Sequence, residues 1–228
     1  MLLHLSLFVL MSLIALTGCR SKQKDGRSGQ GRLHDIASKA RERGSLEASV
    51  PYGFDEEEGE NMMVPTLDDA LSRYEWLVGE PVEEKTVATG NRGIFTIYRF
   101  RVENRAGKHR HPESQWEKEI LDVLPPREGE VLVVKSGGNI VVDGVLLKKR
   151  GKMCFSELMA GRYLLGMTIS SSGRVGGLPM GCRSIFAVDQ DRLTPRQSGD
   201  DPVTRGVRDE LGNSLTSFLA AVEKHQLQ

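Results

Sequence analysis

The chain has 228 residues, and its 31 basic and 31 acidic side chains give a formal net charge of zero at pH 7. This balance disfavours a general nucleic-acid-binding protein, which carries a basic excess on its folded part, so no nucleic-acid partner is expected. Residues 62–228 suffice for one domain with its own hydrophobic core, but hardly for two.

An apolar run from Leu5 to Leu16 lies at the start of the chain. A membrane-spanning helix needs about 20 such residues, whereas the hydrophobic region of a secretory signal has about 7–15. No Lys or Arg precedes the run, which is unusual for such a signal, but small residues follow it. We therefore expect residues 1–18 to be a signal peptide.

The four residues Leu16-Thr17-Gly18-Cys19 resemble the lipobox of bacterial lipoproteins. The resemblance implies that the Cys19 thiol receives a diacylglycerol, that cleavage precedes Cys19, and that its new amine is acylated. Two or more acyl chains hold a protein stably on a membrane. Arg20 is not the Asp that retains some lipoproteins in the inner membrane, so the resemblance implies the outer membrane in a two-membrane bacterium. The alternative is an ordinary signal peptide followed by a chance cysteine.

Residues 19–61 have few apolar side chains and a divided charge pattern. From Arg20 to Arg43 there are eight Lys or Arg and three Asp or Glu, whereas the segment from Glu47 to Glu60 has six acids and no base. Such a composition predicts a flexible tether. Its basic half lies next to the membrane, where anionic headgroups attract cations; the alternative is a solvated spacer. Residues 34–44 form at most a marginal helix with little tertiary support.

The first elements of the folded part follow from capping and from alternation. Thr66 with Asp69 predicts a helix start of the capping-box type, and residues 75–87 are typical of a strand with a possible break at Gly79 and Pro81. Residues 93–104 give the clearest strand, because apolar and charged side chains alternate there with period two. The alternating positions are Tyr98, Phe100 and Val102 against Arg99, Arg101 and Glu103.

Residues 117–124 are consistent with either a helical turn or a short strand. Asp143-Gly144 between β-branched runs predicts a hairpin, and residues 162–169 and 183–189 supply two more strands. Helical spacing over about 201–225 predicts a C-terminal helix with a break near Gly212-Asn213. The expected fold is therefore mainly β: a small antiparallel OB-like barrel or sandwich with a C-terminal helix.

Residues Cys154 to Met167, "CFSELMAGRYLLGM", resemble a pattern of netrin-like domains and tissue inhibitors of metalloproteinases. The resemblance implies a five-stranded OB-type barrel over residues 66–190. Those inhibitors chelate the zinc of their target with a free N-terminal cysteine, whereas Cys19 is expected to carry lipid. The resemblance therefore does not imply their inhibitory mechanism.

With Cys19 lipidated, Cys154 and Cys182 remain as the one possible intramolecular pair. Disulfides persist in exported proteins, and closing this loop stabilises the fold by roughly 3–4 kcal/mol in the chain-entropy model. The alternative is two independent buried thiols.

His109, His111 and Glu113 alternate in a polar segment and are weak candidate ligands for Zn²⁺ or Cu²⁺. They lack the i, i+4 spacing of a helical metal site, and the alternative is a solvated loop. No cofactor is therefore expected.

The Ser- and Gly-rich residues 169–183 contain neither a nucleophile elbow nor a phosphate-binding loop. We expect a mobile loop there, and the alternative is a binding loop.

A basic patch is the remaining candidate for partner binding. It combines Arg99 and Arg101 with Lys135, Lys148 and Lys149; the alternative is a charged face that keeps the sheet soluble. These features favour a lipid-anchored, non-catalytic binding module of the cell envelope with a protein partner. The alternatives are a metal-dependent hydrolase that uses the His109, His111 and Glu113 cluster, and a purely structural lipoprotein.

Overall fold

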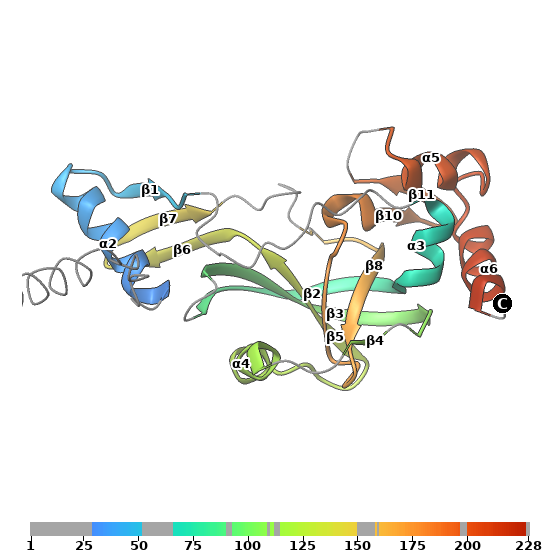
Figure 1. Cartoon of the computed structure of the whole chain (residues 1–228), viewed down its shortest axis with the longest axis horizontal. Coiled ribbons are helices and arrows are strands. Elements are labelled where there is room, and N and C mark those ends of the chain that lie inside the picture. Colours follow the sequence, from blue (N-terminus) through green and yellow to red (C-terminus); the bar gives the residue numbers. More distant parts are fainter. Residues whose placement is uncertain are drawn as a thin grey trace, which may run out of the picture.

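The computed structural model describes residues 29–51, 66–89, 93–108, 110–111, 115–149, 158, 160–196 and 200–226 (Figure 1). The predictions that fall on residues 1–28, on the lipobox above all, lie outside these ranges. Strands dominate the described part and two helices lie at its C-terminal end, so the expectation of a mainly β fold with a C-terminal helical region is confirmed.

Five strands of the larger sheet form a closed ring. Their bounds are β2 (Glu75–Thr89), β3 (Gly93–Ala106), β5 (Glu130–Ser136), β8 (Tyr163–Ser170) and β9 (Val175–Gly177). The ring runs β8-β2-β3-β5-β9 and returns to β8, and every pairing is antiparallel except the parallel one between β5 and β9. The ring meets the description of a small closed barrel.

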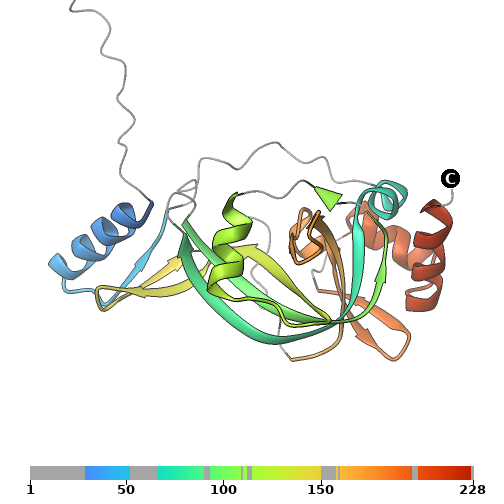
Figure 2. The ribbon, with the colours of Figure 1, turned by 90° about the horizontal axis from the view of Figure 1, so that it is seen from below.

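The barrel interior is a packed apolar core. Tyr98 and Phe100 of β3 lie inside it, as the alternating pattern predicts, and contact Val131 and Val133 of β5 and Leu165 of β8. The outer side of the same strands is not an open wet face. Helix α4 (Gln115–Val123) covers part of it (Figure 2). Its Ile120 packs against Ile97 and Leu132.

Strand β2 is continuous through the expected break. Its register against β3 shifts between Val78 and Gly79 and again between Pro81 and Glu83. A Cβ on Gly79 would lie 1.9 Å from the carbonyl oxygen of Arg101, so only glycine permits this close approach. Gly and Pro therefore mark irregularities within one long strand and not its end.

Part of the expected mobile loop at residues 169–183 is regular structure, and that prediction is wrong for it. Residues Val175–Gly177 form β9, and residues Gly181–Ser184 form the 3-10 helix η1. A Cβ on Gly176 would lie 2.7 Å from Cε of Met167, so this glycine lets β9 approach β8. The glycines that suggested mobility permit strand pairing here.

A helical layer covers one end of the barrel. It comprises α3 (Leu67–Arg73), α5 (Pro202–Asp209) and α6 (Leu215–Gln226), with strands β4 (Arg110–His111), β10 (Ile185–Asp189) and β11 (Arg192–Pro195) nearby. The capping box of Thr66 and Asp69 is present, as predicted. Asn213, with φ 57°, follows Gly212 at the break between α5 and α6, as expected. Trp76 and Phe218 form the centre of this core, with ring centroids 4.6 Å apart.

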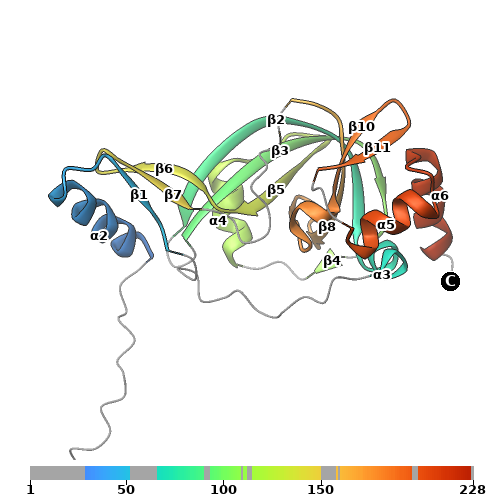
Figure 3. The ribbon, with the colours of Figure 1, turned by 90° about the horizontal axis from the view of Figure 1, so that it is seen from above.

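A second, smaller unit lies at the opposite end of the molecule (Figures 1 and 3). It comprises helix α2 (Gly29–Glu42) and a three-stranded sheet of β1 (Glu47–Ser49), β7 (Val145–Lys149) and β6 (Gly138–Val142), in the order β1-β7-β6. The Asp143-Gly144 turn joins β6 to β7 with both residues at positive φ, as the hairpin prediction requires. We call α2, β1, β6 and β7 the small unit.

The prediction of a flexible tether over residues 19–61 is wrong for residues 29–51. Leu33 and Ala37 of α2 are buried against Val145 and Leu147 of β7, and β1 pairs in parallel with β7. The burial that offsets the entropy of ordering comes from a hairpin about a hundred residues later, which no local pattern reveals.

Candidate interaction surface

The structure does not bring the predicted basic patch together. Arg99 and Arg101 lie on the outer face of β3, whereas Lys135 of β5 pairs with Thr96, on the face that continues the barrel interior. Lys148 lies on β7 of the other sheet. Lys149, the fifth member, is buried on β7. The five side chains therefore do not form one surface.

Arg99 is a buried structural cation. Its side chain is 9% exposed, and its guanidinium lies 3.0 Å from Oε2 of Glu83 and 3.4 Å from Oε2 of Glu130. Arg101 is exposed, and its Nη1 lies 2.7 Å from Oε1 of Glu80. Both arginines are thus neutralised within the chain, which removes them as a free anion-binding pair.

Two polar contacts fasten residues 29–51 to the β6–β7 hairpin. Nζ of Lys148 lies 2.6 Å from Oε2 of Glu47, and Nδ1 of His34 lies 2.7 Å from Oδ2 of Asp143. The predicted binding residue Lys148 therefore joins two strands of the small unit. The spacing of Leu33, Ala37 and Ala40 places them on one helical face. This pattern indicates a weakly apolar face of α2, but it does not indicate the hairpin as the surface that covers it.

Lys149 is a buried lysine of β7 whose pKa departs clearly from its ordinary value. It lies on the covered face of the small sheet, 7% exposed, with Nζ 5.7 Å from the ring centroid of Phe95. Burial lowers the pKa of Lys149 to about 8. The group is still mostly protonated at neutral pH, so its charge destabilises the folded state.

Helix α2 ends in a turn that presents unpaired cations. The backbone N–H of Gly44, a residue with φ 71°, donates to the carbonyl of Arg41, and that of Ser45 donates to the carbonyl of Ala40. This is the Schellman pattern of helix termination. Leu46 follows and is 72% exposed. We call residues 39–46 the basic turn, after its exposed cations Lys39, Arg41 and Arg43.

Within the described residues, these three cations form no ion pair. They contrast with Arg99, Arg101 and Lys148, each of which has a carboxylate partner. The acid of the turn, Glu42, accepts a hydrogen bond from Ser38 at 3.4 Å. The basic turn therefore keeps a net positive charge available to a partner.

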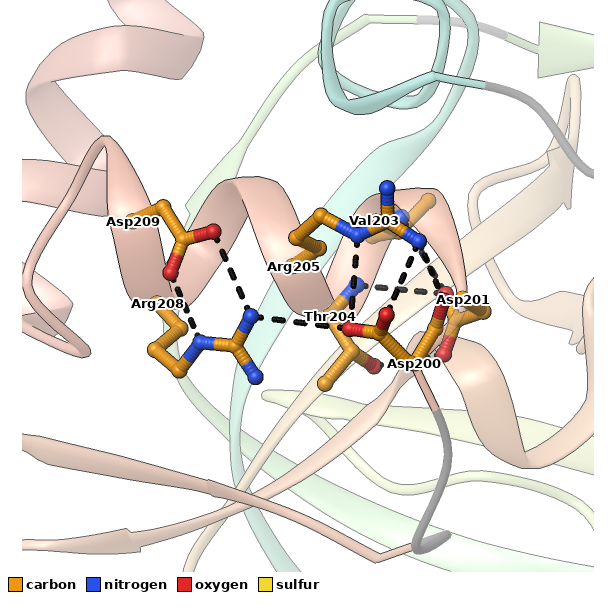
Figure 4. A network of polar contacts seen from close by, with 7 residues as sticks. All are labelled: Asp200, Asp201, Val203, Thr204, Arg205, Arg208 and Asp209. Carbon is orange, nitrogen blue, oxygen red and sulfur yellow. Dashed lines mark hydrogen bonds and ion pairs between the residues drawn. The ribbon is translucent and has the colours of Figure 1, made fainter.

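A second charged network lies on α5, and no sequence pattern singled it out (Figure 4). Asp201 caps the helix by accepting from the backbone N–H groups of Val203 and Thr204. Arg208 contacts both Asp200 and Asp209, and its hydrogen bond lowers the pKa of Asp209. Because its charged groups are bonded to one another and to the first turn of α5, this network stabilises the helix.

The remaining candidate residues fall wholly or partly outside the description. His109 and Glu113 lie outside it, and only the backbone of His111 is described, in β4 next to Ser170 of β8. Among the described residues, no three His, Cys, Asp or Glu side chains form a metal-binding group. The sulfur of the buried Cys182 is disulfide-bonded. Cys154 lies outside the description, so its pairing with Cys182 stays a prediction.

No family model matches this chain, and neither the curated proteins nor the solved structures compared with it include a match. None of the described helices is both long and apolar enough to cross a bilayer.

Proposed function

We propose that this chain is an exported, lipid-anchored protein of the cell envelope that acts as a non-catalytic binding module. The anchor is the lipid on Cys19, which the lipobox resemblance implies. The observation that supports the proposal best is the basic turn, whose three cations stay unpaired among the described residues while the strand arginines are neutralised. Unpaired exposed charge suits recognition of a partner better than it suits stability.

The anchor is tested by expressing the full chain and its Cys19→Ser variant in a bacterial host. The unmodified chain is expected in the membrane fraction, with an N-terminal peptide whose mass includes a diacylglycerol and an acyl chain. The variant is expected to lose the lipid mass and to leave the membrane fraction. An unmodified Cys19 in membrane-bound protein contradicts the anchor.

The binding role is tested by crosslinking intact envelopes that contain the tagged full chain, followed by capture and mass spectrometry. One envelope protein recovered in near-equal amount supports a binding module. Recovery at background level only, with correct lipidation and folding, contradicts the protein-binding role and favours a purely structural lipoprotein.

The export route also bears on Cys182. We propose that its disulfide partner is Cys154, because a lipidated Cys19 has its thiol blocked and the chain has three cysteines. Peptide mapping of exported protein without reduction is expected to recover a linked Cys154–Cys182 peptide. A linked Cys19 peptide instead contradicts both the pairing and the lipid anchor.

A further inference from the structure

We propose that the basic turn docks on the anionic headgroups of the membrane that holds the Cys19 lipid, and so orients the whole molecule. The inference rests on the proposed lipid anchor, and it gives the protein a second, electrostatic contact with the same membrane. The small unit lies at one end of the elongated molecule, and α5 and α6 lie at the other (Figures 1 and 3). With the basic turn on the membrane, the barrel stands beyond it and the C-terminal helices point away.

Chain length places the basic turn within reach of the bilayer. Nine residues, 20–28, separate Cys19 from the first residue of α2, Gly29. A fully extended chain spans at most about 3.3–3.6 Å per residue, so the ten steps from Cys19 to Gly29 cover roughly 35 Å. The helix adds about 1.5 Å per residue between Gly29 and the turn. A short tether of this kind holds the turn at a high effective concentration above the lipid surface, so a weak intrinsic affinity suffices.

The positive charge of the basic turn favours an anionic lipid surface as its binding partner. The segment from Arg20 to Arg43 has eight bases and three acids. Lys39 and Arg41 are exposed on the last turn of α2, and Arg43 is exposed just after it. Two acids of the small unit are engaged elsewhere, Asp143 with His34 and Glu47 with Lys148. Glu42, within the turn, accepts a hydrogen bond from Ser38 and lowers the net charge of the turn by one. Near an anionic leaflet, each Lys or Arg raises the affinity for the membrane about fivefold.

Exposed apolar side chains accompany the cations at the same end of the molecule. Leu46, 72% exposed, follows the cations in the basic turn, and Val141 of β6 is 65% exposed. The described part of the chain has one other large hydrophobic residue that is exposed, Val82. A cationic turn with a protruding Leu suits the interface between headgroups and acyl chains.

The test uses the full mature chain with Cys19→Ser, so that its outcome does not depend on lipidation. Binding is measured by co-sedimentation with phosphatidylcholine vesicles, with and without phosphatidylglycerol. We expect binding only to the anionic vesicles, weakened by salt. Reversing Lys39, Arg41 and Arg43 to Glu is expected to lower the partition coefficient by roughly 100-fold or more, as three contacts of about fivefold each require.

The matched control reverses three exposed cations away from the small unit, Lys118, Arg127 and Lys224. It carries the same change in net charge, and its vesicle binding is expected to fall far less. Equal losses in both triple variants would show attraction to net charge alone and overturn the docking surface. Binding lost only on reversal of Arg20, Lys22, Lys24 and Arg27 would overturn it as well.

Orientation is measured separately, by introducing Trp and recording its quenching by brominated phospholipid. Leu46→Trp is expected to be quenched on anionic vesicles, and Lys224→Trp on α6 is not. Quenching of Lys224→Trp alone would reverse the proposed orientation. If charge reversal in the basic turn abolishes a crosslinked protein partner but leaves vesicle binding unchanged, the turn binds protein and the membrane proposal is wrong.

Discussion

Arg99 lies 3.4 Å from Glu130 across neighbouring strands of the barrel, and both side chains are almost fully buried, at 9% and 6% exposed. The strand pattern predicted a wet face at Arg99, yet the folded chain covers it. Oε2 of Glu130 also accepts a hydrogen bond from the backbone N–H of Arg127 at 2.9 Å. The pair therefore fixes β3, β5 and the turn before β5 relative to one another.

Arg99→Ala is expected to destabilise the fold by about 3–5 kcal/mol, because it leaves the buried Glu130 carboxylate without its cation. Arg101→Ala is the matched control: its partner Glu80 is exposed, and loss of such a pair costs about 1 kcal/mol or less. Urea unfolding of both variants measures the difference. Equal losses of stability would mean that Arg99 is solvated.

Lys149 is expected to make stability rise with pH. Its pKa is about 8 in the folded state and near 10.5 when unfolded. Between these values the unfolded chain binds the proton and the folded chain does not, so the free energy of unfolding increases from about pH 8 to pH 10.5. Below pH 8 both states are protonated, and the destabilisation stays constant.

Lys149→Met is therefore expected to be more stable than the parent at pH 7. Its free energy of unfolding is expected to show little of the increase between about pH 8 and pH 10.5 that the parent shows. Denaturant midpoints at several pH values between neutral and pH 10 measure both effects. The control is Lys148→Met, because Lys148 is exposed and bonded to Glu47. Parallel pH profiles for the parent and Lys149→Met would contradict the assignment.

Ala37→Asp is expected to undock α2 from the small sheet. Ala37 is fully buried, and an unpaired carboxylate there costs several kcal/mol. Hydrogen exchange is expected to show loss of amide protection in α2 and β1, with protection in β3 and β5 unchanged. Lys39→Asp introduces the same carboxylate at an exposed position of the helix and is expected to leave protection in place. Unchanged protection in Ala37→Asp would show that α2 is not packed as described.

Gly79→Ala is expected to destabilise the barrel by about 1–3 kcal/mol or more, because overpacking forces backbone to move. The added Cβ would meet backbone, the carbonyl oxygen of Arg101 at 1.9 Å, which cannot rotate away. Gly177→Ala adds a Cβ whose nearest neighbour is Oγ1 of Thr168 at 3.9 Å, an ordinary contact. Thermal unfolding of the two variants is expected to separate them clearly.

Local signals predicted local structure well. Thr66 and Asp69 form the expected capping box, Asp143-Gly144 forms the expected turn, and Tyr98 and Phe100 point into the core. Each of these depends on neighbours in sequence, on side chains that reach their own backbone or on residues that tolerate positive φ. The lipobox is local too, but it lies outside the described residues and stays a prediction.

The charged residues show where local signals end. Alternation placed Arg99 and Arg101 on one face of β3, but it carried no information on what covers that face. Glu130 is buried beside Arg99, whereas Glu80 is exposed to solvent beside Arg101. The same residue type is therefore a structural cation at one position and a surface charge two residues later.

The sequence by itself determined the positions of most strands, turns and caps, because these follow from the conformational preferences of adjacent residues. Only the tertiary structure decided that β9 closes the barrel, that residues 29–51 fold onto a hairpin far along the chain, and that the cations of the basic turn stay unpaired among the described residues. Closure, docking and charge pairing depend on which distant surfaces meet, and the free energy of burial that drives them is gained only after they do.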